Sequence, residues 1–235
     1  MRGALLISVC TLCFLHQGES AFAQDPTPST TMAPSAAPAT APDGQVVDGV
    51  AARIEDDIIL ESEVRELGLF QKLVDGKEKP RDELIRELAD QWVVRGEIET
   101  AKYPPPSAAD VDRAYAQLAA QFGSPEEFAK RCAAVGLTKA AVRRMLEQQL
   151  YLSRFLDFRF RPAAQIDSKQ IEAYYHDQFV PQLKAKNELV PPLDDVEDTI
   201  REVLVQQAIS DRSAQWLDDT RSRLKIDVVA HGEKP

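Results

Sequence analysis

Hydrophobic residues at the start of the folded region occur in two short runs separated by acidic residues. The runs are Val50–Ile54 and Ile58–Leu60, and Glu55, Asp56 and Asp57 lie between them. Short runs rich in β-branched residues on either side of a polar turn are typical of a β-hairpin. We therefore expect the fold to open with a small hairpin.

After the hairpin, the apolar positions recur at the spacing of α-helices. Ser62 is expected to cap a helix that runs through Val74, and a second helix is expected from about Pro80 to Tyr103. Pro104–Pro106 ends this second helix, because proline lacks the backbone N–H that a helix interior needs.

Three further helices are marked by good start signals. Ser107 with Asp110 resembles a capping box, and Ser124 is followed by a proline and two glutamates, as at many helix starts. Thr138 is a third hydroxyl cap. With Gly123 and Gly136 as stops, these signals predict helices of about 16, 11 and 22 residues joined by tight turns.

The last part of the chain predicts two more helices and a strand. Asp167 with Gln170 starts a helix that runs to about Lys186, and Asp194 with Asp195 starts a long helix whose apolar positions extend to Leu224. Lys225–Val229 then alternates like a strand. Isolated strands are marginal in water, so this strand should pair with the opening hairpin. The expected fold is mainly α, a multi-helix core domain with a small β-sheet formed by the N-terminal hairpin and the C-terminal strand.

The first 23 residues have the pattern of a secretory signal peptide. Arg2 precedes a 12-residue uncharged stretch, Ala4–Leu15, and Ala21-Phe22-Ala23 has the small-x-small form of a cleavage site. We expect cleavage between Ala23 and Gln24 and a periplasmic location. The apolar stretch is too short for a permanent membrane span, so no integral membrane segment is expected in the mature form.

The remaining chain divides by composition. Residues 24–45 contain five prolines among Ala, Ser and Thr, which predicts a disordered linker because such a segment buries too little apolar surface to offset its ordering entropy. Residues 46–230 form the expected domain, and residues 231–235 a flexible tail.

Charge and composition exclude several functions. The chain has 38 acidic and 28 basic side chains, a net charge of −10 and a pI near 4.9, which opposes binding to nucleic acid. After loss of the signal only Cys132, His176 and His231 remain of the Cys and His residues, and no phosphate-binding glycine loop occurs. We therefore expect no metal, no cofactor and no catalytic residues. Cys132 should be a buried core thiol, and His176 a surface or partly packed helix residue.

One segment is more apolar than a surface helix needs to be. Leu150–Phe160 has seven apolar or aromatic residues in eleven, so it should be contacted on more than one side. One interpretation is burial under the long last helix. The other is that it lines a groove that receives another chain. The candidates for peptide binding are Met145, Tyr151, Phe155 and Phe158.

Read together, these segments resemble the SurA family of periplasmic chaperones. VDGVAARIEDDIILESEVREL is similar to the family's opening hairpin and helix start, although Glu55 stands where the family often has Asn. DELIRELADQWVVRGEIETA resembles its second helix. The segment from Ser107 to Phe155 resembles the next three helices, and the last helix carries the family's Trp-Leu pair as Trp216-Leu217. The resemblance covers Val47 to Val229.

The family's parvulin prolyl isomerase domains have no counterpart in this chain. Between Phe179 and Leu193 it has only FVPQLKAKNELVPPL, whereas a parvulin domain takes about 90 residues, so isomerase activity is not expected from the resemblance. The resemblance implies an ATP-independent periplasmic chaperone that holds unfolded or nascent secreted and outer-membrane polypeptides in an apolar, helix-lined groove. Two alternatives remain open at this stage, a peptidyl-prolyl isomerase and an envelope adaptor that binds one folded partner. A homodimer is also open.

Overall fold

The computed structural model of the chain describes residues 48–230. The expected signal peptide, its cleavage position, the linker and the C-terminal tail therefore lie outside the described residues. Among residues 48–230, no helix combines the length and the apolar character needed to cross a membrane.

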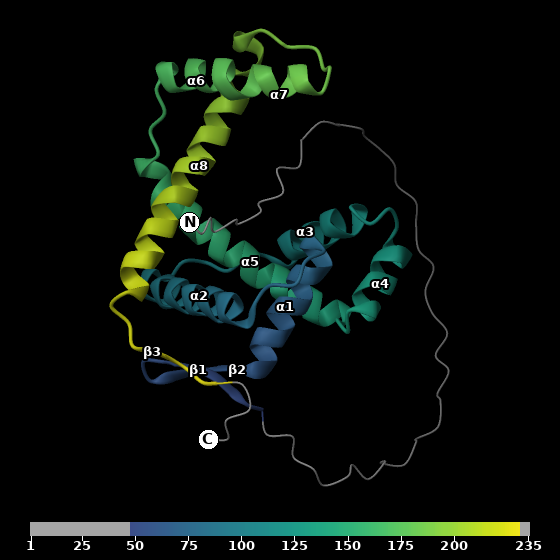
Figure 1. Cartoon of the computed structure of the whole chain (residues 1–235), viewed down its shortest axis with the longest axis vertical. Coiled ribbons are helices and arrows are strands. Elements are labelled where there is room, and N and C mark those ends of the chain that lie inside the picture. The colour runs from purple at the N-terminus through teal and green to yellow at the C-terminus, as the bar shows by residue number, and fades with distance from the viewer. Residues whose placement is uncertain (1–47, 231–235) are drawn as a thin grey trace. The chain divides into compact units, whose positions relative to one another are not determined.

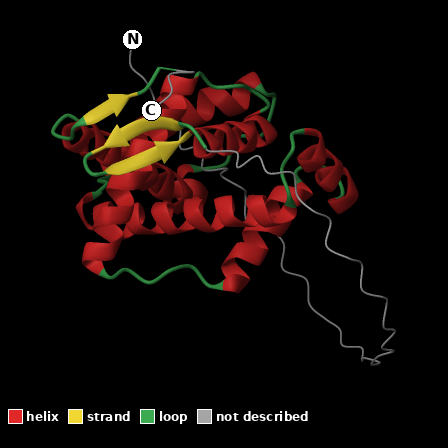
Figure 2. Ribbon diagram, turned by 90° about the horizontal axis from the view of Figure 1, so that it is seen from below, coloured by secondary structure: helices red, strands yellow, loops and turns green. Residues whose placement is uncertain are grey.

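A three-stranded antiparallel sheet joins the two ends of the described chain. β1 (Val50–Ile54) and β2 (Asp57–Leu60) form the expected hairpin, and β3 (Ile226–Val228) pairs with the other side of β1, which gives the order β2-β1-β3. Glu55 in the hairpin turn has φ of 49°, the left-handed conformation that tight turns require. Figure 2 shows the sheet lying against the helices. The predicted fold class, including this pairing of distant segments, is confirmed.

The first helix begins earlier than expected. α1 (Glu61–Asp75) follows β2 directly, and the backbone N–H of Leu60 donates to Glu63 Oε2 at 2.8 Å. The predicted cap, Ser62, was wrong, since this residue lies inside the first turn and its N–H donates to Asp48 Oδ1 at 3.2 Å. The continuous passage from strand to helix leaves no room for a separate cap.

The next four helices agree with the predicted start signals. α2 spans Arg81–Ala101, and α3 (Ala108–Ala120), α4 (Pro125–Ala134) and α5 (Lys139–Phe160) follow. Ser107, Ser124 and Thr138 each accept a bond from the backbone N–H three residues later, at 3.2, 3.2 and 3.1 Å. These caps are confirmed.

The segment after α5 is helical but interrupted. A short 3-10 turn, η1 (Arg161–Ala163), leads to α6 (Ser168–Tyr174), a π-helical turn η2 (Tyr175–Phe179) and α7 (Val180–Ala185). The expected helix from Asp167 is thus present, with a widened turn in its middle. Pro181 explains the widening, because its ring would clash with the carbonyl of Asp177 in a regular α-helix.

The last helix, α8 (Leu193–Arg221), leads the chain back to the sheet. It contacts α6 near its beginning and α5 and α2 further along, as Figure 1 shows. The main core lies between the sheet and α1 to α5, and its fully buried side chains include Phe70, Ile85, Phe128 and Val142. Cys132 is buried there as predicted, and desolvation raises the pKa of its thiol.

Candidate peptide-binding surface

Tyr103 is the centre of an aromatic cluster that lies between the end of α2 and the second half of α5. Its ring centroid lies 6.3 Å from that of Tyr151, 5.7 Å from Phe155 and 5.1 Å from Phe158. We call these four residues the Tyr103 cluster. Aromatic pairs at such separations stabilise one another beyond the area that they bury.

Local backbone structure explains how Tyr103 is positioned. At the end of α2, the N–H of Lys102 donates to the carbonyl of Glu99 at 3.3 Å, and the N–H of Tyr103 donates to the carbonyl of Ile98 at 3.1 Å. This is a Schellman motif, with Lys102 at φ of 50° in the position that usually takes glycine. The three prolines that follow prevent any continuation of the helix.

Polar bonds fix the two tyrosines. Tyr151 Oη donates to the carbonyl of Tyr103 at 2.5 Å, and Tyr103 Oη donates to the carbonyl of Arg154 at 3.4 Å. The rings therefore have both apolar neighbours and hydrogen-bond partners, as buried or half-buried tyrosines usually do. Hydrogen bonds and ring packing together hold the two tyrosines in place.

The four sequence candidates differ sharply in exposure. Phe158 is 60% exposed and Tyr151 is half-buried, whereas Phe155 is 1% and Met145 is 8% exposed. Phe155 and Met145 are therefore buried, and of the four candidates Tyr151 and Phe158 are the two with accessible surface. Phe155 lies beneath the surface, where its ring packs against that of Tyr103. The structure brings Tyr151, Phe155 and Phe158 together and places Met145 apart, in the main core.

Tyr103 was missed by reasoning from the sequence. It lies 48 residues before Tyr151, and it follows a helix end rather than an apolar run. Its position directly before three prolines was the available signal, since a residue there is forced out of the helix and turns toward whatever packs beside it.

Ion pairs form the rim of the Tyr103 cluster. Arg154 donates to Asp110 at 2.8 Å, and Arg159 donates to Glu97 at 2.7 Å while its guanidinium lies 4.8 Å from the Trp216 ring. The hydrogen bond from Arg154, followed by those from Ser107, holds the pKa of Asp110 well below its usual range. The charges of Arg154 and Arg159 are thus paired with carboxylates of the same molecule.

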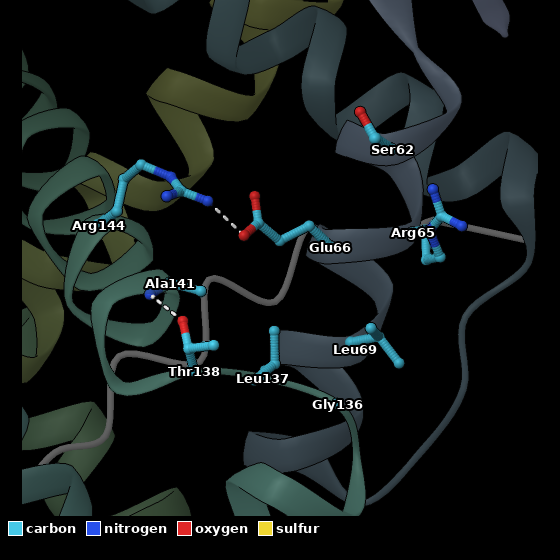
Figure 3. A pocket seen from close by; sticks show the side chains of 9 residues that line it. All are labelled: Ser62, Arg65, Glu66, Leu69, Gly136, Leu137, Thr138, Ala141 and Arg144. Atoms are coloured by element: carbon cyan, nitrogen blue, oxygen red, sulfur yellow. Dashed lines mark hydrogen bonds and ion pairs between the residues drawn. The ribbon is translucent and has the colours of Figure 1, made fainter. Parts of the chain in front are cut away.

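A second depression lies at the opposite end of α5. It has a volume of about 310 Å³ and separates α1 from the turn between α4 and α5 (Figure 3). We call it the α1 groove. Arg144 of α5 pairs with Glu66 of α1 across it. The residues that line it are Ser62, Arg65, Glu66, Leu69, Gly136, Leu137, Thr138, Ala141 and Arg144.

Within residues 48–230, no three His, Cys, Asp or Glu side chains are grouped closely enough to hold a metal ion. His176, on η2, is exposed. Comparison of the chain with protein-family models and with curated proteins finds no match.

Proposed function

We propose that this protein is an ATP-independent periplasmic chaperone that holds unfolded secreted or outer-membrane polypeptides, and that the Tyr103 cluster is part of its binding surface. The observation that carries the proposal is the exposure of Phe158. This large aromatic ring is 60% exposed, yet it lies on the ring of Tyr103, which in turn contacts Tyr151 and Phe155. A preorganised apolar surface binds extended chains without the cost of ordering its own side chains.

The surroundings of the cluster also suit this role. Pro104 and Pro105 are exposed beside it and extend the apolar area. The paired rim charges form a polar border, which is typical of surfaces that bind other chains. A net charge of −10 keeps a protein with exposed apolar surface soluble.

The direct test is an aggregation assay. A denatured outer-membrane barrel protein is diluted into buffer with the purified protein at near-stoichiometric ratio, and light scattering is recorded. We expect the protein to delay aggregation. We also expect Phe158→Ala to weaken client binding by at least fivefold, because loss of an aromatic contact that the bound client buries costs about 1–3 kcal/mol.

The matched control is Ile58→Ala. Ile58 is a half-exposed apolar residue of β2, away from the cluster, so its replacement should leave the delay unchanged. The proposal is wrong if the wild-type protein has no effect on aggregation. Equal losses of client binding in the two variants would show that the binding surface lies outside the Tyr103 cluster.

A further inference from the structure

The helices between η1 and α8 project from the rest of the fold. In Figure 1, α6, η2 and α7 form a bar at the far end of α8, away from the sheet and from α1 to α5. We call residues 165–192 the arm, and the rest of the described chain, α8 included, the body. The chain leaves the body through the non-helical segment 164–167 and returns to it at Pro192, directly before α8. The arm can therefore move without breaking a helix that crosses its boundary.

The arm has almost no core of its own. Ile171, which is 1% exposed, is the single buried residue from Gln165 to Thr199. Other large apolar side chains of the arm, such as Phe179 and Leu183, are half-buried. By contrast, α2 alone has eight buried residues. Burial supplies most of the free energy that offsets the ordering of a segment, so the arm should be among the least stable parts of the molecule.

Polar links between the arm and the body are equally few. No side chain of the arm forms an ion pair with any described residue. Tyr175 Oη donates to the carbonyl of Pro191 at 2.7 Å, and this bond closes the arm on itself. Ion pairs end at the junction, where Arg161 of η1 donates at 2.8 Å to both Asp157 and Glu202. The junction is thus fixed by charge, whereas the arm beyond it is not.

The helices of the arm are also weak in isolation. α6 and α7 are seven and six residues long, and the π-helical turn before Pro181 interrupts the helix between them. Short helices are marginal in water without tertiary packing. By contrast, α8 is 29 residues long, and Asp194 and Asp195 in its first turn stabilise the helix dipole. Glu197 also pairs with Arg201 one turn later. Separation from the arm should therefore leave α8 helical.

From these observations we infer that the arm is a strap on α8, which opens by local unfolding while the body stays folded. In the closed state α6 packs on the first part of α8, where Ile200 is 1% exposed. Val196 and Val203 lie on the same face of α8 as Ile200, four residues before it and three after it. Opening of the arm uncovers this apolar stripe, so the protein displays it in a minor state. The inference does not rest on the Tyr103 cluster or on chaperone activity.

Amide hydrogen exchange of the whole chain under native conditions, read by mass spectrometry, tests the inference. We expect the amides of α6 and α7 to exchange at least about a hundredfold faster than those of α2, and those of α8 to remain protected. Exchange of the arm as slow as that of α2 would overturn the inference, because arm and body would then unfold together. So would exchange of the first half of α8 at the rate of the arm, because no helix would then be left to display the stripe.

Two buried isoleucines give matched variants. Ile171→Ala should speed exchange of the arm at least about tenfold. It should leave the urea midpoint of the body unchanged, because the arm is already open at that concentration. Ile85→Ala in α2, where Ile85 is 2% exposed, should lower that midpoint. Both tryptophans of the chain, Trp92 and Trp216, lie in the body, so their fluorescence reports its unfolding.

Equal shifts of the midpoint in these two variants would contradict a separate arm. Tyr175→Phe is a milder change that removes the hydrogen bond to Pro191 and keeps the ring. It should speed exchange of the arm about threefold and leave exchange of α2 unchanged.

A thiol placed under the arm measures the uncovering of α8 directly. Ile200→Cys puts it where α6 packs on α8, and Cys132, buried in the main core, serves as the internal reference. Under native conditions a thiol reagent should modify position 200 at least about tenfold faster than Cys132. Equal rates of modification at the two positions would show that α8 is uncovered only when the whole protein unfolds, and would overturn the inference.

Discussion

Asp90 of α2 and Arg221 at the end of α8 form an ion pair, although 131 positions separate them in the chain. Asp90 is only 5% exposed, and its Oδ2 atom has no hydrogen-bond partner among residues 48–230. Arg221 also donates to Asp218 at 2.7 Å. The pair therefore fixes the last turn of α8 on α2, just before the chain enters β3.

Removal of Arg221 should be strongly destabilising. We expect Arg221→Met to lower the free energy of unfolding by about 3–5 kcal/mol, because it leaves the buried carboxylate of Asp90 without a counter-charge. The double variant Asp90→Asn with Arg221→Met should recover much of this loss. Urea unfolding measures both effects, and a cost of less than about 1 kcal/mol for the single variant would show that the pair is solvated.

Asp90 should also give the protein a distinctive pH dependence. Burial raises the pKa of Asp90 above its usual value of 3.8, against the opposing effect of Arg221 and, more weakly, Arg86, while Glu87 adds to the rise. Because the folded-state pKa lies above the unfolded one, the folded protein binds this proton more readily. The contribution of Asp90 to stability is therefore greatest at acid pH and is lost as pH rises through the raised pKa.

The measurement is the free energy of unfolding of wild type and Asp90→Asn between about pH 4 and pH 7. The difference in free energy of unfolding between the two proteins should change across this range. The wild type should become more stable relative to the variant as pH falls. A difference that is independent of pH would contradict the raised pKa.

Asp110 should have the opposite effect on the pH dependence of stability. Arg154 and Ser107 hold the pKa of Asp110 below its usual value of 3.8, so its contribution to stability is present above that value and is lost as pH falls toward the folded-state pKa. Acid unfolding of Asp110→Asn should accordingly be less steep below about pH 4 than that of the wild type. Asp211→Asn, on an exposed position of α8, serves as the control and should follow the wild type.

Replacement of Lys102 by glycine should stabilise the folded protein. Its φ of 50° is strained for a residue with a Cβ atom, and glycine adopts this conformation freely. We expect Lys102→Gly to raise the free energy of unfolding by about 0.5–1 kcal/mol. Lys102→Ala keeps the Cβ atom and should bring no such gain, so a thermal unfolding comparison of the two variants separates backbone strain from loss of the lysine side chain.

Substitutions of the two phenylalanines of the Tyr103 cluster should differ in their effect on the stability of the fold. Phe155→Ala should cost about 3–5 kcal/mol of stability, because it leaves a cavity in packed surroundings. Phe158→Ala should cost less than about 1 kcal/mol, because most of its ring is already in water. Chemical unfolding distinguishes them, and a large loss for Phe158→Ala would mean that its ring is buried in solution.

Much of the helical framework could be predicted because its signals are local. Ser107, Ser124 and Thr138 satisfy N–H groups three residues away, so sequence alone locates these helix starts. Ser62 shows the limit of this reasoning. It has the chemistry of a cap, but Asp48 and the strand that ends at Leu60 decide where α1 begins.

The sequence by itself determined the hairpin, the order of the helices, the stop at Pro104–Pro106 and the mainly α class, because each depends on contacts within a few residues of the chain. Only the tertiary structure decided that Tyr103 meets Tyr151 and that Asp90 meets Arg221. It also decided that Phe155 is buried while Phe158, on the same helix, is exposed. Such contacts depend on how helices cross and which faces they cover, and the spacing of hydrophobic residues along one helix does not contain that information.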